Sequence, residues 1–296
     1  MNPSLRTSFM KCSFLLVTLT VVIGCGREPP AADSEESTTE VVAAPDSVPI
    51  RYTVHGTGSP TLVFVHGWMC DKSYWEKQLL PFSQRFEVVA VDLAGHGESG
   101  LGRQAWTIAS FGDDVAAVVK ELGLEHVVLI GHSMGGDVKV EAARRLPGRV
   151  DGLVWIDTYS QLGKPRTAEQ IQAFLEPFRS DFVQTTYEFV RGMFPPGTNV
   201  SLVEWVARDM STGPPEVGIG AISSSFAHAS EIIADLEELN LPVIAINPDN
   251  ESTDMESMKR HGVEVVLLSG VGHFMMMEDP ERFNSTLMGA VDRFIE

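Results

Sequence analysis

Basic residues are scarce in this chain. Its 296 residues include 22 Lys and Arg against 40 Asp and Glu, which gives a formal net charge of −18 at pH 7. Proteins that bind nucleic acid hold the phosphate backbone with clustered Lys and Arg, and an excess of acidic residues repels it. We therefore expect no nucleic-acid ligand.

Cysteine is also rare, and the histidines are scattered. The three cysteines are Cys12, Cys25 and Cys70, which are too few and too dispersed for a disulfide framework. We expect Cys70 to act as a small buried hydrophobic residue. None of the eight histidines stands at metal-ligand spacing from Cys, Asp or another His. We therefore expect no metal site and no cofactor.

A hydrophobic run of membrane-spanning length is missing as well. The apolar stretch at residues 14–23 is too short to cross a bilayer, and Arg6 and Lys11 precede it, as in a secretory signal. The run ends in Val22-Ile23-Gly24-Cys25, which resembles a bacterial lipobox. The resemblance implies that residues 1–24 are a lipoprotein signal peptide, and that a lipid-bearing Cys25 anchors an exported protein to a bacterial membrane. It leaves open which membrane and which face.

The composition changes again after the cysteine. Residues 25–48 are rich in Pro, Ala, Ser, Thr and acid and cannot bury enough apolar surface to become ordered, so we expect a flexible linker. Residues 49–296 then have the length of one large α/β domain. Residues 158–241 interrupt the regular pattern of that domain with helical spacing of apolar and aromatic side chains, and we expect them to form a helical insertion.

Short apolar runs alternate with helical patterns through this domain. The expected strands are residues 61–65, 88–91, 127–130, 153–156, 243–246 and 263–268, and the expected helices are residues 72–84, 108–122, 134–146 and 281–295. Strands that are apolar throughout are typical of a sheet covered on both faces. The alternation predicts a doubly wound, mostly parallel sheet.

A serine stands at one of the strand-to-helix junctions. Gly131-His132-Ser133-Met134-Gly135-Gly136 follows an expected strand and begins an expected helix. The pattern Gly-x-Ser-x-Gly in this context indicates a nucleophile elbow, a sharp turn that holds the serine in a strained conformation and exposes its hydroxyl. Ser133 is therefore the candidate nucleophile.

Four motifs in register make the region from about Pro49 to Glu296 resemble the α/β-hydrolase fold. They are His66-Gly67-Trp68 after one strand, Asp92-Leu93-Ala94-Gly95-His96-Gly97-Glu98-Ser99 after the next, the elbow around Ser133, and Gly272-His273-Phe274 after the last strand. In that fold an insertion at residues 158–241, after the sixth strand, usually forms a lid over the serine. The resemblance implies acyl-transfer chemistry.

Acyl transfer needs a base, an acid and an oxyanion hole. His273, on a glycine-flanked loop, is the expected base, whereas we expect His132 to face away inside the elbow. The resemblance places the acid after the strand at residues 243–246, where Asp249 fits best and Glu251 and Asp254 are possible. Asp157 is the alternative acid. The backbone N–H groups of Trp68 and Met134 are the expected oxyanion donors.

These residues predict a serine hydrolase that cleaves an ester or related acyl bond of a small to medium apolar substrate. A serine at the elbow argues against the dehalogenases and epoxide hydrolases of this fold, which use a carboxylate there. Amide, lactone, carbon–carbon bond and perhydrolase chemistry remain open. The alternative from another class is a sensor that binds a small ligand and hydrolyses it slowly or not at all.

Overall fold

The computed structural model describes residues 39–250 and 252–295. The expected signal peptide at residues 1–24 and the expected lipidation site Cys25 lie outside this range, as does Glu251. Among the described residues, no helix combines the length and the apolar character needed to cross a membrane.

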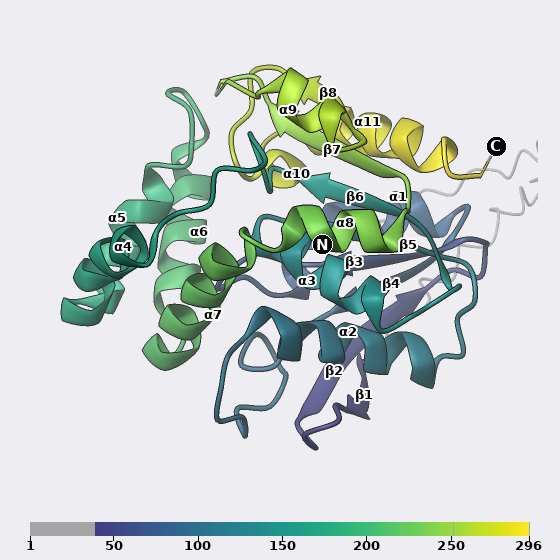
Figure 1. Ribbon diagram of the computed structural model, residues 1–296, viewed down its shortest axis with the longest axis horizontal. Coiled ribbons are helices and arrows are strands. Elements are labelled where there is room, and N and C mark those ends of the chain that lie inside the picture. Colours follow the sequence, from purple (N-terminus) through teal and green to yellow (C-terminus); the bar gives the residue numbers. More distant parts are fainter. Residues whose placement is uncertain (1–38, 251, 296) are drawn as a thin grey trace, which may run out of the picture. The chain divides into compact units, whose positions relative to one another are not determined.

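An eight-stranded sheet forms the centre of the described chain (Figure 1). Its spatial order is β1-β2-β4-β3-β5-β6-β7-β8. The two pairings at one edge, β1 with β2 and β2 with β4, are antiparallel, and all others are parallel. The strands are β1 (Thr39–Ala43), β2 (Pro49–His55), β3 (Thr61–Val65), β4 (Glu87–Val91), β5 (Val127–His132), β6 (Val150–Ile156), β7 (Val243–Pro248) and β8 (Val263–Leu268). The prediction of a mostly parallel sheet is confirmed.

Helices cover both faces of this sheet, so its central strands contain hardly any polar side chain. Every residue of β3 and of β5 is buried. Helices α2 (Ile108–Glu121), α3 (Met134–Arg144) and α8 (Ile232–Leu239) lie on one side, where α3 contacts the other two. On the other side, α11 (Pro280–Asp292) packs against α1 (Glu76–Ser83) and α10 (Met275–Glu278). The short helices η1 (Lys72–Trp75) and α9 (Met255–Arg260) complete this part of the chain.

The segment between β6 and β7 is helical, as expected. It contains α4 (Ala168–Ser180), α5 (Phe182–Arg191), α6 (Val200–Ser211), α7 (Pro215–His228) and α8. Helices α4 to α7 lie together beyond the carboxyl ends of the parallel strands, with α4 against α7 and α5 against α6 (Figure 1). Capping helps to fix the start of α4, because the Thr167 hydroxyl accepts from the Gln170 N–H and the Gln170 side chain accepts from the Thr167 N–H.

The sheet begins earlier in the sequence than predicted. Residues 39–43, which the composition assigned to the flexible linker, form the edge strand β1. Val42 lies opposite Ile50 in the antiparallel register, and the Tyr52 hydroxyl donates to Glu40 Oε2 over 3.1 Å. An edge strand with one partner needs little apolar surface of its own, so a few residues of β propensity within an acidic segment are enough. Residues 39–43 therefore belong to the sheet and not to the expected linker at residues 25–48.

Candidate active site

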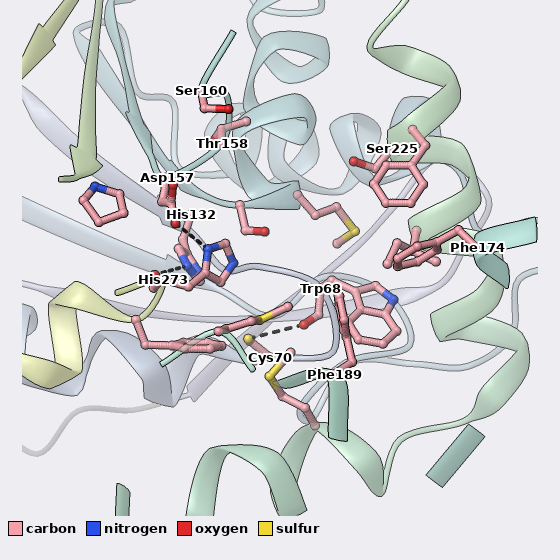
Figure 2. Close-up of a pocket in the computed structure, with 18 of the residues that line it drawn as sticks. Trp68, Cys70, His132, Asp157, Thr158, Ser160, Phe174, Phe189, Ser225 and His273 are labelled. Carbon is pink, nitrogen blue, oxygen red and sulfur yellow. Dashed lines mark hydrogen bonds and ion pairs between the residues drawn. The ribbon is translucent and has the colours of Figure 1, made fainter. Parts of the chain in front are cut away.

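The candidate catalytic residues follow different strands but meet at one edge of the sheet. Trp68 comes after β3, Ser133 after β5, Asp157 after β6 and His273 after β8. Parallel strands end at the same edge, which is where open α/β sheets form their clefts. All four residues line one cavity of about 350 Å³, and Figure 2 shows how Asp157, His273 and Trp68 lie around it.

Ser133 has the backbone strain expected of an elbow. Its φ of 50° and ψ of −120° are unusual for a residue with a side chain, and its N–H donates to the Ile156 carbonyl over 2.9 Å. The flanking glycines are needed for space. A Cβ on Gly131 would lie 2.2 Å from the Gly135 carbonyl oxygen, and one on Gly135 would lie 2.5 Å from the carbonyl oxygens of Val65 and His66. The turn therefore closes only with glycine at both positions.

Asp157, rather than Asp249, contacts His273. His273 Nδ1 and Asp157 Oδ2 are 2.6 Å apart, and because a carboxylate only accepts, the imidazole donates (Figure 2). Asp249 lies on the surface, where its Oδ1 accepts from the Gly270 N–H over 3.3 Å. Strand β7 extends to Pro248, two residues beyond the predicted end of the strand. Pro248 and Asn250 line the cavity, but Asp249 between them does not, and its carboxylate contacts the loop after β8 instead. The order of preference between the two acids is corrected accordingly.

The loop that carries His273 is held by groups on three sides. His132 Nε2 donates to the His273 carbonyl over 2.9 Å, and the two rings are 4.6 Å apart between centroids. The expectation that His132 faces away is therefore wrong. Glu278 accepts from the N–H groups of Gly272 and Phe274, the neighbours of His273, over 3.0 and 3.2 Å. The His273 N–H donates to the Met193 carbonyl at the end of α5 over 3.3 Å.

Sequence analysis did not identify Glu278 and predicted the wrong orientation for His132, for different reasons. Glu278 lies five residues beyond His273, and only the turn into α10 brings its carboxylate back to the loop. The sequence offered one signal, since Glu278 directly follows three methionines. A charged residue next to such an apolar run is expected to have a polar partner. His132 was visible as a residue of the elbow, but its orientation depends on the approach of the β8 loop.

Burial keeps the surrounding histidines neutral. Desolvation, with the nearby His273 as a smaller cause, lowers the pKa of His132 well below its usual range. Desolvation likewise lowers the pKa of His66 to about 4 and that of His96 to about 3. His132 therefore provides a hydrogen-bond donor next to His273 without adding a positive charge.

The two expected oxyanion donors belong to residues that line the cavity. Met134 begins α3, and Trp68 lies in the loop after β3; no hydrogen bond to a described residue is found for either backbone N–H. His66 fixes that loop, since its Nδ1 donates to the Gly67 carbonyl over 2.8 Å while its Nε2 accepts from the Leu93 N–H over 3.1 Å. The Trp68 indole N–H donates to the Gly218 carbonyl of α7 over 2.7 Å, which ties the loop to the helical insertion.

The strand order, the elbow around Ser133 and the loop that carries His273 are consistent with the family that the sequence matches. A model of the alpha/beta hydrolase family matches residues 62–286. The chain belongs to this family. The match includes the residues after β3, the elbow, the helical insertion and the histidine loop.

Individual relatives show how far this similarity extends. A non-heme haloperoxidase of Rhodococcus erythropolis is 28% identical over 279 residues, which cover 85% of this chain and 98% of that protein. The dihydrolipoyllysine-residue acetyltransferase component of the acetoin cleaving system of Cupriavidus necator is 36% identical over 126 residues, but these cover 42% of this chain and 34% of that protein. Among solved structures, a thermophilic esterase from Thermogutta terrifontis has a TM-score of 0.75 at 25% identity, with 87% of this chain and 99% of that chain covered.

The wall of the cavity in this α/β hydrolase is part apolar and part polar. Much of its apolar part comes from the helical insertion, with Phe174 of α4, Phe189 of α5, Met210 of α6, and Ile222 and Phe226 of α7. Cys70 also lines it, and the thiol is buried, as expected, with a pKa that burial raises well above its usual value. A thiol in that state is unreactive. Polar groups enter the lining from Thr158, Ser160 and Ser225.

One group of side chains in the described part of the hydrolase has metal-like spacing. The ligand atoms of Glu141, His228 and Asp235 lie within 4.8 Å of one another. The Arg144 guanidinium forms ion pairs with Glu141 over 2.8 Å and with Asp235 over 3.2 Å. Arg145 also pairs with Glu141, so two arginines neutralise the two carboxylates and the cluster is a structural ion-pair network between α3 and α8.

Proposed function

We propose that this α/β hydrolase is a serine hydrolase that cleaves an ester or related acyl bond. The observation that carries the proposal is the strained Ser133 in the same cavity as a His273 imidazole paired with a carboxylate at 2.6 Å. A serine hydroxyl is a weak nucleophile until a base takes its proton, and an imidazole can do so when its other nitrogen is held as a donor. Asp157 gives His273 that tautomer.

The reaction follows from these roles. Ser133 Oγ attacks the carbonyl carbon and its proton passes to His273 Nε2, while Asp157 stabilises the imidazolium that forms. The carbonyl oxygen becomes negative and accepts from the N–H groups of Trp68 and Met134, each of which contributes about 3 kcal/mol of transition-state stabilisation. The intermediate then expels the alcohol, which takes the proton from His273, and leaves an acyl group on Ser133. Water repeats these steps and releases the acid.

The cavity supports a substrate of small to medium size with an apolar body. Its volume of about 350 Å³ is at the lower end of ligand sites, and the apolar part of its wall contains aromatic rings, methionine and isoleucine. The relatives in the family include an esterase and a haloperoxidase, and a serine nucleophile suits the ester reaction. Ester hydrolysis is therefore the reaction we test first.

A fluorophosphonate probe and an ester panel test the function. We expect the probe to label Ser133, and short and medium acyl esters to be hydrolysed with many turnovers, whereas Ser133→Ala is neither labelled nor active. Labelling with no more than one slow turnover across the panel would favour a ligand sensor. An active Ser133→Ala variant, or wild-type protein with neither labelling nor turnover, would overturn the proposal.

The proposal includes the location of the enzyme. We infer that signal cleavage before Cys25 and acylation of that cysteine anchor the hydrolase to a bacterial membrane, on the side to which lipoproteins are exported. The residues that support this are the apolar run 14–23 and the lipobox-like sequence at residues 22–25.

A further inference from the structure

Arg166 stands in the wall of the same cavity, on the loop between β6 and α4. Its guanidinium carbon lies 4.5 Å from the centre of the Phe226 ring and 5.4 Å from that of Phe174. Two aromatic rings therefore hold the planar group in place by cation–π contact and leave its N–H donors free to bind.

The charge of this guanidinium is not neutralised by the described protein. Most of the arginines in the described residues form ion pairs, as expected in an acidic chain, but Arg166 forms none with a described carboxylate. The side chain is exposed, so water solvates it in the absence of a ligand. An unpaired cation next to apolar rings is well placed to bind an anion that enters the cavity.

Arg166 lies next to the aromatic part of the cavity wall, beside Phe226 and Phe174. Figure 2 shows Asp157 and His273 at one end and Phe174 and Ser225 at the other, and it is Phe174 that Arg166 covers. An anion bound there would belong to a part of the substrate remote from the scissile bond.

A second, more polar pocket of about 270 Å³ shares Ser133 and Arg166 with the first. Lys164 and Ser160 also line it. One carboxylate, Asp137, lines it too, but its oxygens accept from the hydroxyls of Tyr159 and Ser225, each over 2.6 Å. Burial raises the pKa of Asp137. The balance of charge near Arg166 therefore favours an anionic ligand.

We propose that Arg166 binds a carboxylate on the substrate, so that the hydrolase prefers esters that carry a free carboxylate at the end remote from the scissile bond. This inference rests on the proposed function. A guanidinium matches a carboxylate with two parallel N–H donors, and the apolar side chains of Phe174, Ile222 and Phe226 in the same cavity would accommodate the hydrocarbon that joins the two ends of such a substrate. Arg166 is thus a specificity-determining residue.

Matched ester pairs test the preference by kinetics. On the acyl side, the para-nitrophenyl half-ester of glutaric acid is compared with the neutral para-nitrophenyl pentanoate. On the alcohol side, 4-acetoxybutanoate is compared with its methyl ester, and release of acetate is measured for both. We expect the wild type to favour the anionic member of at least one pair in kcat/KM, and Arg166→Gln to lower kcat/KM for that substrate about tenfold to hundredfold while changing the neutral partner less than about threefold.

Two further variants separate a specific contact from a general effect of charge. Arg166→Lys keeps the charge without the planar fork and should recover only part of the preference. Arg179→Gln removes one positive charge from α4 at a residue that lines neither pocket, and it should leave the preference unchanged. Equal losses for both members of each pair in Arg166→Gln, or no preference in the wild type, would overturn the proposal.

Binding to Ser133→Ala distinguishes failure of this proposal from failure of the proposed function. Titration calorimetry with the glutarate half-ester should give tighter binding than with the neutral ester, and Arg166→Gln in the same background should remove the difference. Arg166-dependent binding in a protein that hydrolyses no ester would support the carboxylate site and reject the hydrolase. Turnover of both esters with equal binding would reject the carboxylate site alone.

Discussion

At the scale of single residues, one hydrogen bond distinguishes Asp157 from Asp249, two carboxylates at similar positions in the fold. Asp157 and Asp249 both follow a strand and both lie near the carboxyl edge of the sheet, yet only Asp157 contacts the imidazole, at 2.6 Å. Asp157 also adopts a positive φ of 44°, and its N–H donates to the Ile246 carbonyl over 2.9 Å. The backbone thus turns at the point where the Asp157 carboxylate faces the cavity, whereas Asp249, directly after β7, accepts from the Gly270 N–H instead.

This difference predicts unequal effects of the same substitution. Asp157→Asn keeps the size of the side chain but removes the charge that stabilises the imidazolium, so we expect kcat to fall about a thousandfold or more. Asp249→Asn should stay within about threefold of the wild type, because Asp249 is a surface residue outside the cavity lining. Steady-state ester hydrolysis by the two purified variants measures both values. A larger loss in Asp249→Asn than in Asp157→Asn would restore Asp249 as the acid.

At the scale of elements, the sequence predicted those parts whose pattern is local. The buried strands and the amphipathic helices α2, α3 and α11 repeat their apolar residues at regular spacing, and the elbow has a defined sequence of glycines. The contacts of Glu278 with the His273 loop could not be predicted, because they depend on how α10 turns back. The edge strand β1 could not be predicted either. Its segment is acidic and has few apolar residues, and it is ordered by backbone pairing with β2.

The elbow also shows how two elements constrain each other. Strand β5 and helix α3 meet at Ser133, and Gly135 in the first turn of α3 lies against the end of β3. That strand leads into the loop that carries Trp68. The backbone contact at Gly135 therefore couples the position of the proposed nucleophile to that of the proposed oxyanion donor.

Replacing this glycine should disturb stability and activity together. In Gly135→Ala the new methyl group would meet the Val65 and His66 carbonyl oxygens at 2.5 Å, and since these are backbone atoms, we expect a loss of about 1–3 kcal/mol in unfolding free energy. We also expect kcat to fall, because the Trp68 loop must shift. Urea denaturation and ester assays measure the two effects.

Gly289 of α11 offers the matched control. A Cβ there meets no atom within 4 Å, and the residue is exposed in the interior of a helix. Gly289→Ala should therefore stabilise the protein by about 0.5–1 kcal/mol and leave kcat unchanged. Equal stability changes in the two variants would show that the contact of Gly135 with β3 carries no constraint.

At the scale of the whole molecule, the net charge determines whether the protein would be attracted to or repelled from a membrane surface. Removal of residues 1–24 would take away Arg6 and Lys11 and no acidic residue, which changes the formal charge from −18 to −20. Bacterial membranes carry anionic lipids, so the mature chain would be repelled from their surface within about one Debye length, about 8 Å at physiological ionic strength. The net charge therefore disfavours electrostatic attachment to an anionic bilayer, and apolar contact would provide a stable attachment.

Acyl chains on Cys25 would provide that contact, since each buried methylene contributes about 0.8 kcal/mol. We therefore expect full-length protein expressed in a bacterium to sediment with membranes, to remain there in high salt and to be released by detergent. Cys25→Ser should move to the soluble exported fraction with its esterase activity intact. Cys12→Ser, a substitution within the expected signal, should sediment like the wild type. Release of the wild type by salt would indicate an electrostatic or peripheral association, and retention of Cys25→Ser on membranes would show that the attachment does not depend on lipidation of this cysteine.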